Sequence, residues 1–598
     1  MNLLLLLTFL YATQSVKDQI VVTASALPES VESTPASVTV ITKEDIDKRE
    51  ARDVSEVLRE VPGVAVSRTG SLGKTTSLFI RGSSSKQALV LWNGVEINDP
   101  YFSGYNWGQF STAGVERVEV ARGPFSSLYG ADAVGGVVNI ITTGGRDRMD
   151  IDVAAGGRGL FNGVATLTRT FGTTNVHAAV EHRQDDGFAP NDDYRQSSVI
   201  GGFTTNATKS LNLGITGRWA DYDLGVPRNT NDTFTAFVPT PHHRENGTEW
   251  QLALPVTAEL GRFHADLRLA QNHRDDHNED PDAGAFGTTK SMRRTIHVAA
   301  HTDTAIGTLT AGGEAERAEA ENTDSFGLDL STHHRSSNAL FLEDRYTHDF
   351  AAAGRLELTL GARRDEYTTF GSEVSPRVAA AWWRDGNKFR AAYGQAFRAP
   401  QIGELYLPFF GNPDLHAERS RSAEIGYDRY FGASSSFSIT AFNARFRDLI
   451  AYDFLTSRFQ NIGEARSRGI ELAGTHRSGP FSAAASYTYL HATEEPAGTQ
   501  LLRRPKHSGS IALGYDRGPA STQLVVARVG SRPDVTDIFP FGTVTNRAYT
   551  VADLTVRWIA GAFAPYAKVE NLTNTKYQEV FGYPSPTRRA LVGVRWTR

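Results

Sequence analysis

The sequence predicts an all-β transmembrane barrel of about 22 antiparallel strands, with a small α/β domain from the N-terminal part of the chain inside its lumen. Residues 146–598 alternate apolar and polar side chains, without intervening helical segments. Residues 31–145 have a mixed α/β pattern, and no apolar run after the first residues is long enough for a helix that spans a bilayer. A membrane protein made from this chain must therefore cross with a closed set of strands.

The first residues are typical of a secretory signal. The apolar run Leu3–Ala12 is too short to span a bilayer, and cleavage is expected between Ala12 and Ser15. We therefore assign residues 1–15 to a signal peptide and residues 16–30 to a linker.

The pattern of residues 31–145 predicts a compact domain. Thr42 with Asp45 forms a capping-box pattern before a helix, and Asp53 with Glu56 repeats this signal before Val54–Arg59. The apolar segment Ala88–Trp92 meets Asn93-Gly94, a strong hairpin signal. Further strands are expected at Ser37–Ile41, Val95–Ile97, Val115–Ala121 and Gly135–Thr142.

Period-two alternation in residues 146–598 gives each strand one apolar and one polar face. In Leu356–Arg363, for example, Leu358 and Leu360 oppose Glu357 and Thr359. About 20 residues per strand and connection give the predicted strand count, and a lumen of that size is wide enough to hold a further domain.

Composition and motifs exclude several other functions. The chain has 598 residues, no cysteine and a formal net charge of -5, which excludes disulfides and thiolate metal sites and argues against a nucleic-acid binder. The spacing around Gly70 does not match a phosphate loop, and no nucleophile–base pair is evident. We expect no enzymatic activity and no required cofactor.

Several strings carry a family resemblance. Four plug-like strings occur in order: Leu78–Gly82, Leu91–Val95, Val118–Pro124 and Tyr129–Ile140. Gly394–Pro400, Gly411–Leu415 and Val569–Leu572 follow in the barrel part. Together they resemble the TonB-dependent outer-membrane receptors, over nearly the whole chain. The chain departs from that family at its end, which is Trp596-Thr597-Arg598 in place of a terminal aromatic residue that the barrel-assembly machinery recognises.

The resemblance implies a plug–barrel lock and an energy-coupling segment. Arg81 and Arg122 match the two plug arginines of the family, and Glu424 and Glu471 match the barrel glutamates that receive them. The segment that resembles the TonB box pairs as an added strand with the periplasmic protein TonB. It comprises Asp18, Gln19, Ile20, Val21, Val22, Thr23 and Ala24.

Within the family the likeness is strongest to the cobalamin (vitamin B12) receptors, and it implies calcium in the extracellular loops. Clustered carboxylates repel one another unless a cation bridges them, and Ca²⁺ takes six to eight oxygen ligands. The candidate calcium ligands are Asp185, Asp186, Asp221, Asp223, Asp276 and Asp280.

Two plug loops, 68–77 and 98–111, are expected to meet the substrate. The second loop is rich in aromatic residues, which suit a flat or catecholate-bearing ligand, so a ferric siderophore is the alternative to cobalamin. The same aromatic residues could instead pack against the barrel wall. The candidate ligand contacts are Ser71, Leu72, Tyr101, Phe102, Tyr105 and Trp107.

The expected function is TonB-dependent import of a scarce, bulky nutrient by a monomer in the outer membrane of a bacterium. TonB, outer-membrane lipid and the nutrient are the expected partners, and nucleic acid is not. A passive porin or adhesin would lack the plug and the segment 18–24. A secreted carbohydrate enzyme would need a paired-carboxylate cleft, and a receptor that only signals would carry an extra domain before the box.

Overall fold

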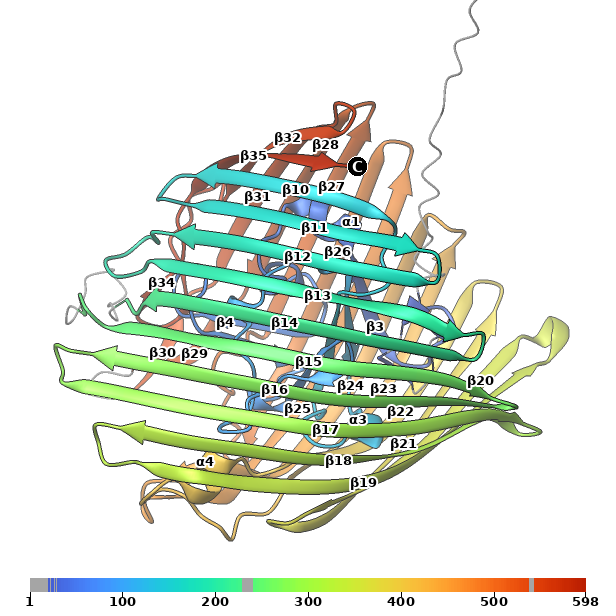
Figure 1. The fold of residues 1–598 in the computed structure, drawn as a ribbon, viewed down its shortest axis with the longest axis horizontal. Helices are drawn as coiled ribbons and strands as arrows, with labels where there is room; N and C mark the ends of the chain where they lie inside the picture. The colour runs from blue at the N-terminus through green and yellow to red at the C-terminus, as the bar shows by residue number, and fades with distance from the viewer. Residues whose placement is uncertain (1–19, 22, 26, 28, 228–239, 537–541) are drawn as a thin grey trace, which may run out of the picture.

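The computed structural model describes residues 20, 21, 23–25, 27, 29–227, 240–536 and 542–598. The signal peptide predicted at 1–15, and Asp18, Gln19 and Val22 of the predicted box, lie outside these residues. The described chain forms a closed antiparallel barrel around an N-terminal domain, called the plug below (Figure 1). No helix of the described chain is long and apolar enough to cross a membrane.

The barrel has 22 strands, as the alternation predicts, and closes where β10 pairs with β35, for example at Ile151 and Trp596. Each strand pairs with the next along the chain, apart from two small hairpins inserted near the end. The strands are β10 Arg148–Gly156, β11 Phe161–Phe171, β12 Thr174–Asp185, β13 Tyr194–Thr208, β14 Leu211–Gly225, β15 Arg244–Leu260, β16 Phe263–Asp280, β17 Ala285–Thr304, β18 Gly307–Asp324, β19 Leu330–Asp349, β20 Arg355–Tyr367, β21 Gly371–Arg384, β22 Asn387–Arg398, β23 Glu418–Phe431, β24 Ser435–Asp453, β25 Arg458–Ser478, β26 Phe481–Glu495, β27 His507–Arg517, β28 Ala520–Val529, β31 Tyr549–Trp558, β32 Phe563–Glu570 and β35 Arg589–Thr597.

The two ends of the barrel differ. At one end, the turn end, tight connections such as 172–173, 209–210 and 479–480 join the strands. At the other, the loop end, lie the longer connections 399–417, 530–548 and 571–588. These hold α4 (Ile402–Tyr406) and the hairpins β29–β30 (Arg532–Val535, Thr543–Asn546) and β33–β34 (Gln578–Val580, Tyr583–Pro584). Short turns face the periplasm and long loops face outside in such barrels, so the loop end is extracellular.

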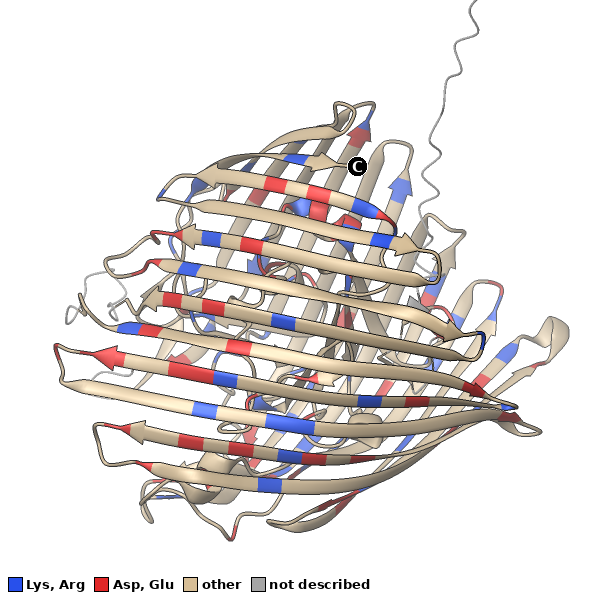
Figure 2. Cartoon of the chain, in the orientation of Figure 1, with Lys and Arg blue, Asp and Glu red and all other residues tan. Residues whose placement is uncertain are grey.

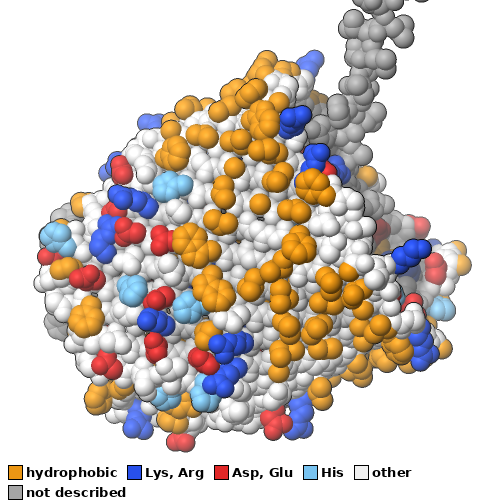
Figure 3. Space-filling model, in the orientation of Figure 1, with side chains coloured by type: hydrophobic (Ala, Val, Ile, Leu, Met, Phe, Trp, Pro, Cys, Tyr) orange, Lys and Arg blue, Asp and Glu red, His pale blue; other side chains and the backbone are white. Residues whose placement is uncertain are grey.

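The outer surface carries an apolar belt. Strand β20 shows the predicted alternation, because Glu357 and Thr359 are buried inside while Leu360 is 47% exposed outside. Figure 3 shows hydrophobic side chains spread over the strands in view, with charged and histidine side chains gathered toward the loop end at left. Figure 2 shows the same bias of charge on β14–β17. At the turn end the belt is bordered by aromatic residues: Phe171, Phe263, Phe350, Trp382, Phe389, Phe431, Phe437, Phe481, Trp558 and Phe563.

The plug is built on a five-stranded sheet of order β3-β8-β9-β6-β7. Thr42 accepts a hydrogen bond from Asp45 in a capping box, and Asp53 caps the next helix, as the sequence predicts. Asn93 and Gly94 both have positive φ and close the predicted hairpin. The elements are β1 Ile20–Val21, β2 Glu29–Ser30, β3 Ser37–Thr42, α1 Lys43–Arg49, α2 Val54–Leu58, β4 Val64–Arg68, β5 Thr76–Ile80, η2 Ser85–Gln87, β6 Ala88–Trp92, β7 Val95–Glu96, η3 Trp107–Gln109, β8 Arg117–Arg122, α3 Ser126–Tyr129 and β9 Gly136–Ile141; a further short helix, η4 Ala351–Ala353, follows β19 in the barrel.

Two apolar clusters cover the two faces of this sheet. The main core includes Val54, Leu58, Val118 and Ile140, and it joins α2 to one face. On the other face, Leu89, Ala121 and Val137 pack against residues of the N-terminal segment. Both faces of the sheet are therefore buried.

Candidate functional site

The centre of the plug–barrel contact is Arg81, which follows β5. Its Nε donates to Glu471 Oε1 at 2.7 Å and its Nη2 to Glu471 Oε2 at 2.9 Å, while Nη1 binds Glu424. The guanidinium also lies 4.7 Å from the centre of the Phe442 ring. All these groups are buried, and such two-pronged pairs fix orientation as well as distance.

The second plug arginine completes the contact. Arg122 lies 3.3 Å from Glu471 through Nε and donates to Thr39 through Nη1. Burial alone lowers the pKa of an arginine, but Glu471 and Glu424 raise the pKa of Arg81 well above its ordinary value. The structure thus brings together all four residues of the predicted lock, from a plug turn, a plug strand and two barrel strands.

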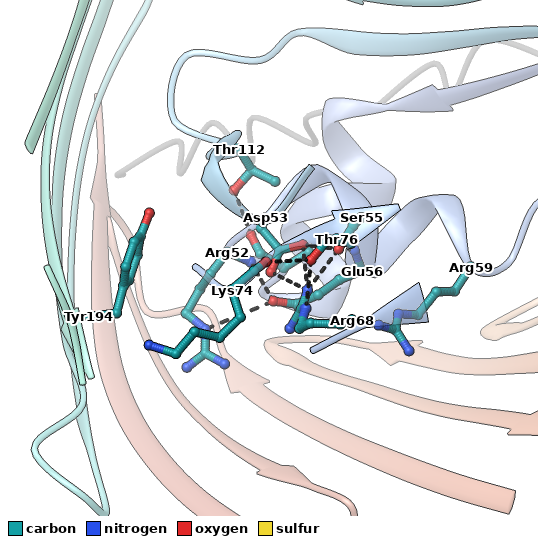
Figure 4. A network of polar contacts seen from close by, with 12 residues as sticks. Arg52, Asp53, Ser55, Glu56, Arg59, Arg68, Lys74, Thr76, Thr112 and Tyr194 are labelled. Carbon is teal, nitrogen blue, oxygen red and sulfur yellow. Dashed lines mark hydrogen bonds and ion pairs between the residues drawn. The ribbon is translucent and has the colours of Figure 1, made fainter. Parts of the chain in front are cut away.

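A polar network that the sequence did not reveal joins the plug to the loop end on another side. Figure 4 shows Asp53, Ser55 and Arg68 turned toward one another. Arg68 Nη2 lies 2.9 Å from Asp53 Oδ2, and its backbone N–H donates to Glu579 Oε2. Arg59 pairs with the same Glu579, on strand β33. Only the capping role of Asp53 was visible in the sequence, since nothing local marks Glu579 as its distant partner.

The N-terminal segment is docked against the plug sheet. Strand β1 pairs with β2, and Val21 and Ala24 are buried in the second apolar cluster. Thr23 Oγ1 donates to Glu119 Oε2 at 2.6 Å and accepts from Asn139 Nδ2 at 3.2 Å. In this conformation the described part of the predicted TonB box is shielded from a periplasmic partner.

The first predicted ligand loop packs against the barrel. Ser71 Oγ donates to Asp192 Oδ1 at 2.8 Å, and Leu72 packs on Tyr194 and Tyr222 of the wall. Lys74 donates to the carbonyl of Asp193 at 2.7 Å, and burial lowers its pKa to about 8 against the opposing effect of Asp192. Ser71 and Leu72 therefore pack against the barrel wall, and their predicted role as ligand contacts stays a prediction.

Most of the second loop is also internal. Trp107 is 2% exposed in the plug core, and Tyr105 packs beside it with its hydroxyl hydrogen-bonded to Glu249. Tyr101 is buried against Ile402 and Leu330. These three aromatic residues thus pack within the plug or against the wall, as the alternative interpretation expects, and their role as ligand contacts stays a prediction.

Phe102 is the exception, and it joins an aromatic cluster at the loop end. Its ring lies 4.5 Å from Tyr101 and 6.2 Å from Phe459, and Phe459 is 5.9 Å from Tyr452. Lys86 of the plug lies over the Phe102 ring at 5.2 Å. Nearby apolar side chains are exposed to solvent: Phe409 is 75% exposed, Phe454 87% and Leu455 96%. We call Phe102, Phe410, Tyr452, Phe454 and Phe459 the aromatic cluster.

The six candidate calcium ligands do not converge. Asp185 is buried in the lumen and pairs with Arg589, whereas Asp186 is exposed. Asp276 faces the lumen and binds Arg274 and Tyr222, whereas Asp221 is exposed on the outer side of β14.

The remaining two aspartates are paired with basic side chains. Asp223 pairs with Arg244 at 2.7 Å, and Asp280 lies 3.7 Å from His243. Within the described residues no three His, Cys, Asp or Glu side chains are placed to hold a metal ion. These donors do not fit the predicted calcium site, because arginine or histidine or the barrel wall separates them.

A plugged outer-membrane barrel with a buried plug–barrel lock defines a gated importer rather than an open pore. The family model described as "TonB dependent receptor-like, beta-barrel" matches residues 122–572, and that described as "TonB-dependent Receptor Plug Domain" matches residues 30–137. The chain belongs to the TonB-dependent receptors. It is accordingly an outer-membrane transporter, not an enzyme.

Solved structures share this fold. The ferripyoverdine receptor of the outer membrane of Pseudomonas aeruginosa is 16% identical with a TM-score of 0.83, over 98% of this chain and 90% of that one. The siderophore receptor PiuA from Acinetobacter baumannii is 15% identical, with a TM-score of 0.79 over 98% and 100%. The FrpB iron transporter from Neisseria meningitidis is 14% identical, with a TM-score of 0.79 over 94% and 100%.

Proposed function

We propose that this receptor imports a ferric siderophore that carries aromatic, catecholate-type iron-binding groups. The observation that carries the proposal is the aromatic cluster, where plug residue Phe102 meets Phe459 of the barrel, itself beside Tyr452, at the extracellular end. Aromatic side chains offer flat contact area to aromatic ligand groups. Lys86 lies over the Phe102 ring, with its ammonium group paired to Glu404 at 3.0 Å.

The solved relatives support the same class of ligand, since they are named as siderophore or iron receptors. Cobalamin, which the sequence favours, gains less support, because four of the six aspartates in the acidic segments are paired with basic side chains and the six do not converge. No described feature favours cobalamin over a ferric chelate.

In the proposed cycle, ligand contact with Phe102 biases the plug, and Val21, Thr23 and Ala24 leave their site on the plug sheet. A ligand can shift such an equilibrium only by its differential affinity for the two states. TonB then adds to the released segment as a strand, and the plug rearranges to pass the ligand.

An equilibrium titration of the purified protein in detergent tests the ligand class. Tryptophan fluorescence is followed with an iron tris-catecholate complex, and separately with cobalamin. We expect saturable binding of the ferric complex alone, weakened about ten-fold by Phe102→Ala through loss of an aromatic anchor. Phe481→Ala, which removes a lipid-facing ring at the turn end, is the matched control and should bind as the parent does. Saturable cobalamin binding without ferric-complex binding would reject the proposal.

A further inference from the structure

A row of arginines crosses the outer face of the barrel on β23, β24 and β25. In the strand register Arg421 lies directly opposite Arg445, and Arg445 lies directly opposite Arg466. Arg419 lies opposite Arg447 one step nearer the loop end. Side chains alternate between the two faces of a strand. Glu424 of β23 and Glu471 of β25 face the lumen, and each lies an odd number of residues from the arginines of its own strand, so these arginines point outward. We call Arg419, Arg421, Arg445, Arg447, Arg466 and Arg468 the arginine patch.

These arginines are poorly neutralised by the protein. Arg419 pairs with Glu373 and Asp448, and Arg466 donates to Asn443. Among the described residues, Arg421, Arg445, Arg447 and Arg468 form no ion pair within 4.0 Å. Glu464 is the one carboxylate of β25 that lies on the same outward face beside Arg466. Like charges directly opposite one another destabilise a sheet, so the row is not explained by strand pairing.

Two other outward arginines of the barrel are paired with carboxylates. Arg317 lies 2.9 Å from Glu319 on its own strand, and Arg364 lies 3.9 Å from Glu366. Acidic side chains two residues away thus neutralise these two arginines, whereas Arg294 donates only to Gln271 and Met292. The patch differs from these single arginines because it gathers six of them on three adjacent strands.

Along the membrane normal, the arginine patch lies at one boundary of the hydrocarbon core of the bilayer. Phe431 marks the turn-end aromatic border on β23, and Ile425, 66% exposed, lies within the belt. Ten residues separate Arg421 from Phe431, about 33 Å along a strand and about 25 Å along the membrane normal at a tilt near 40°. An apolar band is about 25 Å tall in such barrels, so Arg421 lies at its outer boundary.

A cavity opens in the wall beside the patch. Strands β21 and β22 pair only from Arg377 and Gly394 toward the turn end, so their loop-end segments separate. The space between them has a volume of about 370 Å³, and its polar lining comprises Glu373, Ser375, Gln395, Arg419, Ser420, Arg421, Arg445, Arg447 and Asp448. It is large enough for a phosphate group and presents guanidinium donors, which bind phosphate through paired hydrogen bonds.

We propose that the arginine patch binds the phosphate groups of an anionic lipid in the outer leaflet of the membrane. Acyl chains of that lipid would lie on the belt below, over Ile425 and Ile470, while its phosphates meet the guanidinium groups. This site lies on the outside of the wall, apart from the aromatic cluster at the mouth, and does not depend on the ligand that is imported.

The test compares lipid A carrying both phosphates with its dephosphorylated form. The full chain in detergent is mixed with each lipid, and bound lipid is measured by native mass spectrometry. We expect saturable binding of the phosphorylated form and at least ten-fold weaker binding of the dephosphorylated form. Equal binding of the two forms would overturn the proposal even without a variant.

Variants locate the site. Arg421→Gln, Arg445→Gln and Arg466→Gln together should weaken phosphorylated lipid A by roughly 100-fold, since each arginine near a charged surface contributes about five-fold. Arg294→Gln, Arg317→Gln and Arg364→Gln remove three outward arginines elsewhere and should leave binding unchanged. Folding of each variant is checked by whether its barrel stays folded in denaturing detergent that has not been heated. A folded patch variant that binds like the parent, or a control that loses binding equally, would contradict the assignment.

Discussion

Arg81 of the plug and Glu471 of β25 form a two-pronged ion pair inside the lumen, with N–O distances of 2.7 and 2.9 Å. They are 390 residues apart in the chain, and both are buried. The pair therefore links the plug to the barrel at a buried point, where water cannot readily solvate either charge if the pair is broken.

Glu471→Ala should reduce the stability of the plug within the barrel by about 3–5 kcal/mol, because it removes one partner from a buried charged pair. Since the chain has no cysteine, a single Thr75→Cys on the exposed part of a plug loop can carry a fluorophore that reports urea unfolding. Glu319→Ala breaks the exposed Arg317 pair and should change stability by about 0–1 kcal/mol. Similar effects for both variants would contradict a locking role.

Thr23→Val should release the N-terminal segment more often, because it removes the hydroxyl that contacts Glu119 and Asn139. A Ser25→Cys reporter, buried in the parent, should label about five- to 100-fold faster with a soluble maleimide, since losing a buried hydrogen bond costs about 1–3 kcal/mol. Thr23→Ser keeps the hydroxyl and should label at the parent rate. An unchanged rate in the valine variant would show that these contacts do not hold the segment.

Trp107→Ala should destabilise the plug by about 3–5 kcal/mol, as expected for an aromatic residue removed from a core. Affinity of the folded fraction for the ferric complex should stay unchanged, because Trp107 is 2% exposed and lies away from the aromatic cluster. Urea unfolding and the titration are measured on the same preparation. A loss of affinity in the more conservative Trp107→Phe would restore the contact role that the sequence suggests.

Lys74 should make plug stability depend on pH above 8. Burial holds its pKa at about 8 in the folded state, below the ordinary value of 10.5. Between these two values Lys74 is neutral in the folded plug and protonated in the unfolded chain, so unfolding takes up a proton. The free energy of unfolding should therefore increase as pH rises from 8 to 10.5, and that increase should be lost as pH falls back through this range to 8. Urea midpoints of the labelled plug measure this trend. Lys74→Met should remove this increase in plug stability. An equal increase in the parent and in the Lys74→Met variant would assign the pH dependence to another group.

Much of the fold could be predicted from local patterns. The caps at Thr42 and Asp53, the Asn93-Gly94 hairpin and the alternation in β20 each depend on neighbours in the chain, and the structure has them. The strand count followed from length and period alone. Side-chain environments could not be predicted in this way, because whether Tyr105 meets solvent depends on Glu249, a barrel residue 144 positions away in the chain.

The sequence by itself determined the class of this protein, since period-two alternation, the plug strings and the box-like segment are local properties of the chain. It also identified Arg81, Arg122, Glu424 and Glu471, through resemblance. Only the tertiary structure decided that Leu72 and Trp107 pack inside, that Phe102 lies partly buried in the aromatic cluster at the loop end, and that Asp185 binds Arg589. Only strand register aligned Arg421, Arg445 and Arg466 on one outer face. Burial, ion pairing and register are relations between distant segments, and they exist only once the barrel has closed around the plug.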